Sequence, residues 1–80
     1  MQVSAIQKWI NKRPFSPFEI VMSSGDRYPV RHPENLVLSK EGAYVFFKRS
    51  PQEALPDVAI LSYLHIAAAE PVNGKRKQKK

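Results

Sequence analysis

Apolar residues follow a helical spacing at the start of the chain. Ile6, Trp9 and Ile10 recur at intervals of three and one, so they fall on one side of a helix. A helix of about nine residues is shorter than the ~12–15 residues that an isolated helix needs in water. We therefore expect this segment to dock on the rest of the chain, with Trp9 as its anchor.

Polar residues and a proline predict where this helix begins and ends. Ser4 and Gln7 have the spacing of a capping box, which predicts that Ser4 caps the first turn. Lys12 and Arg13 suit the negative end of the helix dipole. Pro14 disfavours helical geometry at the preceding residue, so the helix should end there.

After the helix the apolar spacing changes to a period of two, which predicts strands. Turn-forming residues separate the apolar runs, and Pro29 restricts the second strand to an edge or a bulge. Residues 58–69 also fit a helical stripe, but their β-branched residues and Pro71 favour two strands around one short helical turn. Predicted strands are residues 18–23, 27–31, 36–38, 44–47, 58–62 and 66–72, and the longest loop is 50–57.

Two Pro-Phe pairs join the helix to the first strand. Residues 13–18 read Arg-Pro-Phe-Ser-Pro-Phe, which has the Pro-x-x-Pro spacing of a polyproline recognition peptide. The alternative is architectural: the prolines end the helix and extend the chain, and Phe15 and Phe18 close the two ends of the core. The direct connection between a helix and a strand favours the architectural interpretation.

One short helix and five or six short strands predict a mainly β (α+β) fold. A sheet of this size, curled on itself under a helix, is typical of an SH3-like or Sm-like small barrel with antiparallel strands. Residues 1–72 are predicted to form this single domain. Residues 73–80 contain no apolar residue, so we expect a disordered basic tail.

Several short motifs resemble those of a group of small uncharacterised bacterial proteins. In that group a helix is followed by a PFxPF join, a DGR-type turn, an HPE segment and a terminal LHI…EP strand. The resemblance spans about residues 3–72, departs at the turn, and implies no activity or site residue. Its segments here are PFSPFEI (14–20), GDR (25–27), VRHPE (30–34), LHI (64–66) and EP (70–71).

Composition narrows the classes of function. The chain has 80 residues and no cysteine, which removes disulfides, thiolate metal sites and cysteine nucleophiles. We find no apolar run of ~18 residues that would span a membrane and no signal-peptide pattern. These features favour a cytoplasmic protein without a membrane partner. So small a core leaves no room for a deep substrate cavity, and we expect no cofactor and no small-molecule substrate.

The net charge of +6 belongs mainly to the C-terminal end. Residues 1–74 hold eight Lys and Arg against seven Asp and Glu, a net charge of only +1. Nucleic-acid binding through phosphate contacts is therefore the alternative to protein binding. Its candidate residues are Lys48, Arg49, Lys75, Arg76, Lys77, Lys79 and Lys80.

No polar cluster forms a convincing catalytic or metal site. His32 and Glu34 could pair as base and orienter, or ligate a metal together with His65. The pattern lacks a nucleophile and a fourth ligand, so we interpret residues 32–34 as a turn with Glu34 facing solvent. Residues 23–26 lack the second glycine and the lysine of a phosphate loop and read as a hairpin turn.

The run Tyr44-Val45-Phe46-Phe47 is apolar on both faces of its predicted strand. One face belongs in the core, so the other needs the helix or a partner to cover it. The first functional hypothesis is therefore a non-enzymatic protein-interaction module, whose partner is another protein or a second copy of itself. Under the nucleic-acid alternative, the exposed rings of this strand would stack on bases.

Overall fold

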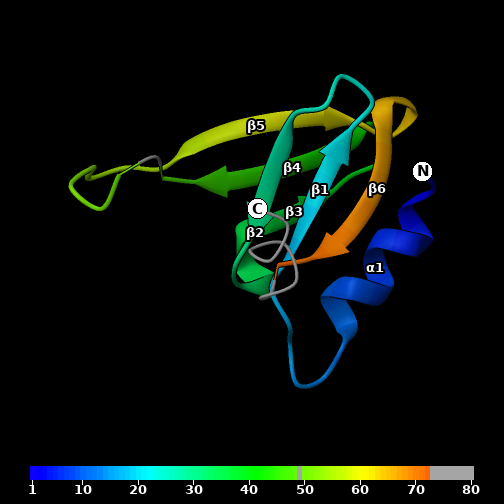
Figure 1. The fold of residues 1–80 in the computed structure, drawn as a ribbon, viewed down its shortest axis with the longest axis horizontal. Coiled ribbons are helices and arrows are strands. Elements are labelled where there is room, and N and C mark those ends of the chain that lie inside the picture. Colours follow the sequence, from blue (N-terminus) through cyan, green and yellow to red (C-terminus); the bar gives the residue numbers. More distant parts are fainter. Residues whose placement is uncertain (49, 73–80) are drawn as a thin grey trace, which may run out of the picture.

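The structure is a computed structural model that describes residues 1–48 and 50–72. A single helix and six strands form the described part, which confirms a mainly β, α+β fold (Figure 1). Two 3₁₀ turns interrupt the strands: η1 (Pro33–Asn35) and η2 (Tyr63–His65). In chain order the other elements are α1 (Val3–Asn11), β1 (Phe18–Met22), β2 (Arg27–Val30), β3 (Leu36–Leu38), β4 (Gly42–Phe47), β5 (Asp57–Ser62) and β6 (Ile66–Pro71).

The strands form two antiparallel three-stranded sheets. The first has the order β2-β1-β6, and the second has the order β3-β4-β5. In the first sheet Phe18 lies opposite both Val30 and Pro71. Within the described residues no ladder joins the sheets into a closed barrel, so the barrel stays a prediction. The predicted edge position of Pro29 is confirmed, because β2 pairs on one side only.

The ambiguous segment after residue 57 forms two strands, as the β-branched residues predicted. Strands β5 and β6 flank η2, and the Ser62 hydroxyl accepts a hydrogen bond of 3.3 Å from the Leu64 amide. This capping interaction holds the turn at which the chain leaves the second sheet and enters the first.

The prediction that Ser4 caps the helix was wrong. Helix α1 begins at Val3, its N-cap is Gln2, and no side chain caps it. The Met1 nitrogen donates to the carbonyls of Tyr63 and Ile66 at 2.9 and 3.1 Å. These long-range bonds hold the chain start against η2 and β6, so the first turn forms two residues earlier than the local pattern predicted.

Helix α1 lies alongside β6 and packs on the core through its apolar stripe (Figure 1). Ile6 is fully buried, whereas Trp9 is half-buried and stacks on the ring of Phe18 with 5.1 Å between centroids. The helix ends at Asn11, two residues before the predicted end. Arg13 lies beyond it and donates to the Ile10 carbonyl at 2.9 Å, so a cation does contact the helix end.

The residues that join α1 to β1 are architectural. Phe18 is fully buried, and Phe15 is half-buried with its ring edge-on to Phe18 at 6.2 Å. The architectural interpretation is therefore confirmed for Phe18 and in part for Phe15, which closes the core less completely.

Turn chemistry fixes the first hairpin. Gly25 has a φ of +100°, a conformation that residues with a Cβ rarely adopt. Its amide donates to the Met22 carbonyl at 2.8 Å, and the Met22 amide donates to the Asp26 carbonyl at 2.8 Å. Residues 23–26 therefore form the predicted hairpin turn, with the glycine at the position that requires it.

The core consists of the inward residues of both sheets together with Ile6. Tyr28 of β2 contacts Phe47 of β4 edge-on at 5.9 Å and so links the two sheets. Among the described residues no helix is long and apolar enough to cross a membrane. Fully or almost fully buried apolar residues are Ile6, Phe18, Ile20, Val30, Leu36, Ala43, Val45, Leu61 and Ile66.

Replacing Phe18 by alanine should remove much of the stability of the domain. The ring is completely buried, and such truncations cost about 3–5 kcal/mol. Phe15→Ala should cost clearly less, because Phe15 is already partly exposed. Urea unfolding measures the loss in free energy of unfolding for each variant. If Phe18→Ala does not fold, Phe18→Leu replaces it in the comparison. Equal losses for the two phenylalanines would contradict this packing.

Candidate functional site

Strand β4 directs apolar side chains to both faces of its sheet. Val45 and Ala43 point inward and are fully buried. Tyr44 and Phe46 point outward and are half-buried. Register places Val37 and Ile60 on either side of Tyr44, and Val58 beside Phe46, so five apolar side chains share one face. We call these five residues (Val37, Tyr44, Phe46, Val58 and Ile60) the outer apolar face.

The outer apolar face is exposed across three neighbouring strands. Ile60 is 68% exposed, and Val37 and Val58 are 50% and 51% exposed. Helix α1 does not cover this face, because Trp9 stacks on Phe18 of the other sheet. Of the two covers predicted for β4, the helix is therefore excluded, and a second chain stays a prediction.

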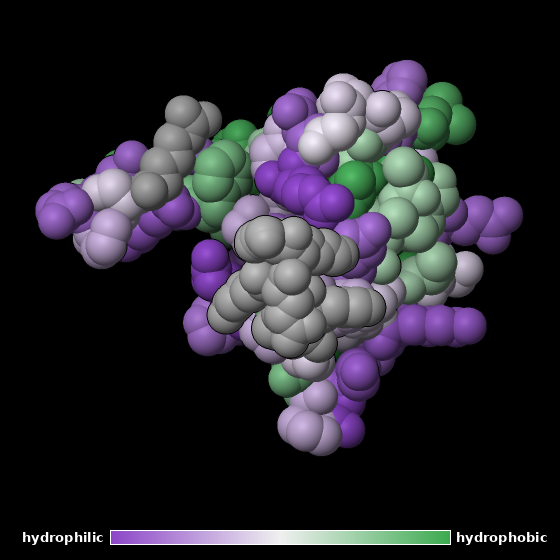
Figure 2. Space-filling view, viewed as in Figure 1, coloured by the Kyte–Doolittle hydropathy of each residue, from purple (hydrophilic) through white to green (hydrophobic). Residues whose placement is uncertain are grey.

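Apart from Asp57 at its start, the β5 edge lacks the features that usually protect a sheet edge. Edge strands are commonly short, or carry proline or charge. Strand β2 contains Pro29, β3 has three residues, and β6 ends with Glu70 and Pro71. Residues 58–61 of β5 are Val-Ala-Ile-Leu and include no such residue. In Figures 1 and 2, the β4–β5 hairpin projects from the body, with hydrophobic surface at its base and polar surface at its tip.

A second surface is a pocket between η1, β2 and the end of the β4–β5 hairpin. Its volume is about 480 Å³. Two prolines, Pro29 and Pro56, complete its wall. We call it the cationic pocket, and its other lining residues are Arg31, His32, Asn35, Phe46, Phe47 and Lys48.

The predicted polar turn contributes to this pocket and not to a metal site. His32 precedes η1, and Glu34 within η1 is exposed, as the turn interpretation predicted. His65, the third ligand of the metal alternative, lies in η2 and is exposed. No group of three or more potential metal ligands occurs among residues 1–48 and 50–72.

Only one of the candidate nucleic-acid residues lies in the described part of the chain. Lys48 directly follows β4, is exposed and lines the cationic pocket. Arg49 and the five cations of residues 75–80 lie outside the described residues. Sequence reasoning missed Arg31 and Asn35 as neighbours of Lys48, because only the packing of β2 against β4 brings them together. The mixture of aromatic and cationic residues at 46–49 was the available signal.

The outer side of the first sheet carries an ion-pair cluster. Arg27 contacts Glu19 and Glu70, each with 3.0 Å between nitrogen and oxygen. Hydrogen bonds to Glu70 and Glu19 raise the pKa of the Arg27 guanidinium above its ordinary value. The cluster ties β2, β1 and β6 together, which is a structural role.

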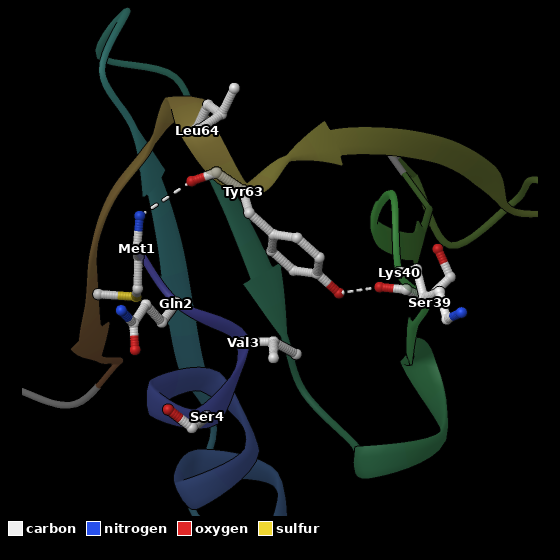
Figure 3. Close-up of a pocket in the computed structure, with 8 residues that line it drawn as sticks. All are labelled: Met1, Gln2, Val3, Ser4, Ser39, Lys40, Tyr63 and Leu64. Atoms are coloured by element: carbon white, nitrogen blue, oxygen red, sulfur yellow. Dashed lines mark hydrogen bonds between the residues drawn. The ribbon is translucent and has the colours of Figure 1, made fainter.

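A second, more open cavity of about 520 Å³ lies where the chain start meets η2 (Figure 3). Two hydrogen bonds cross this cavity. The Met1 nitrogen donates to the Tyr63 carbonyl, and the Tyr63 hydroxyl donates to the Ser39 carbonyl at 2.6 Å. These bonds join the helix start, η2 and the β3–β4 hairpin, so we interpret this cavity as a structural seam.

Tyr63→Phe should destabilise the protein in a pH-dependent way. The variant loses one hydrogen bond, worth about 1 kcal/mol near neutral pH. Burial raises the pKa of Tyr63 above its ordinary value of 10.0. The native state then keeps the proton at a pH where the unfolded chain loses it, so this stabilisation falls as pH rises above about 10.

Chemical unfolding near pH 7 and above pH 10 measures this dependence. The stability difference between the parent chain and Tyr63→Phe should narrow at the higher pH. Tyr44→Phe is the control, because the described residues offer its hydroxyl no hydrogen-bond partner. A difference that stays constant up to pH 11 would show that the Tyr63 proton contributes nothing.

Comparison with known proteins assigns no function to these surfaces. The chain shows no significant match to a protein family, to a curated protein or to a solved structure. Its function is therefore inferred from the outer apolar face and the cationic pocket themselves.

Proposed function

We propose that the protein is a small non-enzymatic interaction module that associates with a second copy of itself through the outer apolar face. The observation that carries this proposal is the continuous exposure of five apolar side chains across β3, β4 and β5. A monomer rarely leaves an apolar patch above roughly 400 Å² uncovered, and this face extends over three neighbouring strands.

The chemistry of the face favours an identical partner. None of its five side chains is charged, so two copies can meet face to face without placing like charges together. Residues 1–74 carry a net charge of only +1, so long-range repulsion between two copies of the body is small. Two sheets that pack face to face in this way lie about 10 Å apart, and their side chains interdigitate between them.

The size of the face implies a weak dimer. A face of five side chains is smaller than the roughly 800 Å² that each partner contributes to a standard stable interface. We therefore propose a reversible association that is seen at micromolar concentrations and above. A partner on this face would also cover Val58 and Ile60, the two exposed apolar side chains on the unprotected edge.

The connections between the two sheets support the barrel architecture that the sequence predicts. The chain passes from β2 through η1 into β3, and from β5 through η2 into β6. These two turns act as corners between the sheets, an arrangement that fits an incomplete SH3-like or Sm-like barrel. We propose this architecture on that basis, and we propose membership of the small bacterial group on the sequence motifs alone.

Sedimentation velocity across about 10–500 μM tests the proposed association. The weight-average mass of the full chain should rise with concentration. Ile60→Lys should abolish the rise, because it places a charge in the centre of the contact. Leu64→Lys is the matched control: Leu64 is 89% exposed in η2, outside the face, so this variant should associate like the parent chain.

Two results would contradict the proposal. One is a parent chain that stays monomeric over the whole range. The other is Ile60→Lys associating as strongly as the parent chain. Thermal unfolding of each variant confirms that the substitution has not unfolded the domain, which we expect because both side chains are already exposed.

A further inference from the structure

The cationic pocket has the volume of a ligand site and shares one residue, Phe46, with the outer apolar face. Its volume of about 480 Å³ lies within the ~300–1,000 Å³ range of small-molecule sites. None of its charged residues belongs to the outer apolar face. Phe46 borders both surfaces.

The charged side chains that line the pocket are cationic. Arg31 and Lys48 bring two cations, and His32 adds an imidazole. No aspartate or glutamate lines the pocket, and no ion pair to these three side chains occurs among the described residues. Glu34 and Asp57 are the nearest acidic residues along the chain, but neither lines the pocket. The pocket therefore favours an anionic ligand.

The remaining lining residues are mainly apolar. Phe47 is held edge-on against Tyr28 at 5.9 Å, so its ring is already positioned by the core. Phe46 and two prolines add further apolar surface, and the Asn35 carboxamide supplies both donors and an acceptor. Such a wall suits a planar heteroaromatic ring, which can stack on an aromatic side chain while its edge forms hydrogen bonds.

We propose that the cationic pocket binds a nucleotide unit, with the phosphate held by Arg31 and Lys48 and the base beside the Phe47 ring. The unit is either a free nucleotide or one residue of a single-stranded nucleic acid, since both present the same phosphate and ring. Arg31 is suited to a phosphate because its guanidinium donates two parallel hydrogen bonds. Lys48 adds a point charge from the opposite wall, and His32 adds a ring nitrogen.

The sequence adds a reason to test a strand as well as a free nucleotide. Five further cations lie within residues 75–80, outside the described part of the chain. A polymer carries several phosphates and could engage several cations at once, whereas a mononucleotide carries a single phosphate group. The two sources should therefore differ in affinity.

The two histidines provide a local readout in the full-length chain. His32 lines the pocket, whereas His65 lies in η2 and does not. Thymidylate is titrated at low salt while the imidazole proton resonances of both histidines are followed by NMR. The His32 resonances should shift and saturate, and the His65 resonances should stay in place. Inorganic phosphate and thymidine, titrated separately, should each bind about tenfold or more weakly than thymidylate.

Two double variants distinguish binding in the pocket from a general effect of the net charge of the protein. Arg31→Gln with Lys48→Gln removes both pocket cations and should weaken thymidylate about tenfold or more. Lys8→Gln with Lys40→Gln removes two exposed cations outside the pocket and lowers the net charge equally. This control pair should bind thymidylate as the parent chain does.

Three outcomes would overturn the proposal. The first is a His32 resonance that does not move with thymidylate. The second is an equal loss of affinity in both double variants, which would assign binding to overall charge. The third is inorganic phosphate binding as tightly as thymidylate, which would remove the base from the site. If the proposal holds, an oligothymidylate that binds at least about tenfold more tightly than thymidylate identifies a strand as the source, and equal affinity identifies a free nucleotide.

Discussion

The contact between Phe18 and the helix holds α1 on the first sheet. Phe18 begins the central strand of the first sheet, lies opposite Val30 and Pro71, and has no exposed surface. Trp9 stacks on its ring, and Phe15 meets the same ring edge-on. A nine-residue helix has no independent stability, so its position depends on this aromatic contact and on the burial of Ile6.

Because the helix packs on the first sheet, no other helix of the described chain covers the outer side of the second sheet. The side-chain period of two then divides β4 into a core face and an exposed face. Val45 and Ala43 enter the core, and Tyr44 and Phe46 are directed outward. The outer apolar face is thus a consequence of where the helix docks. The same packing of β2 against β4 forms the cationic pocket, since it brings Arg31 and His32 to the end of the strand that leads to Lys48.

Periodicity and turn residues predicted most of the fold, because these signals are local. The strands, the hairpin at Gly25, the edge position of Pro29 and the turn at 63–65 all depend on residues close together in sequence. The helix start was predicted wrongly, since contacts of Met1 with η2 and β6 override the Ser4 cap. Ladder pairing decides whether the sheets close, and no local pattern reports it.

The candidate sites were only partly predictable for the same reason. Two-sided apolarity of β4 was visible in the sequence, but which side the helix covers depends on Trp9 meeting Phe18. Lys48 was recognisable beside aromatic residues. Arg31 and His32 precede β3 and β4 in the sequence, so only tertiary packing brings them to Lys48. The ion pairs of Arg27 with Glu19 and Glu70 likewise connect three strands that are distant in sequence.

Side-chain footprinting at increasing protein concentration tests the central claim most directly. That claim is that the outer apolar face is exposed in one chain and covered by another. The account predicts that Tyr44 and Phe46 are labelled in dilute solution and become protected as concentration rises, while Phe18 is protected throughout. Protection of Tyr44 and Phe46 that does not change with concentration would contradict it.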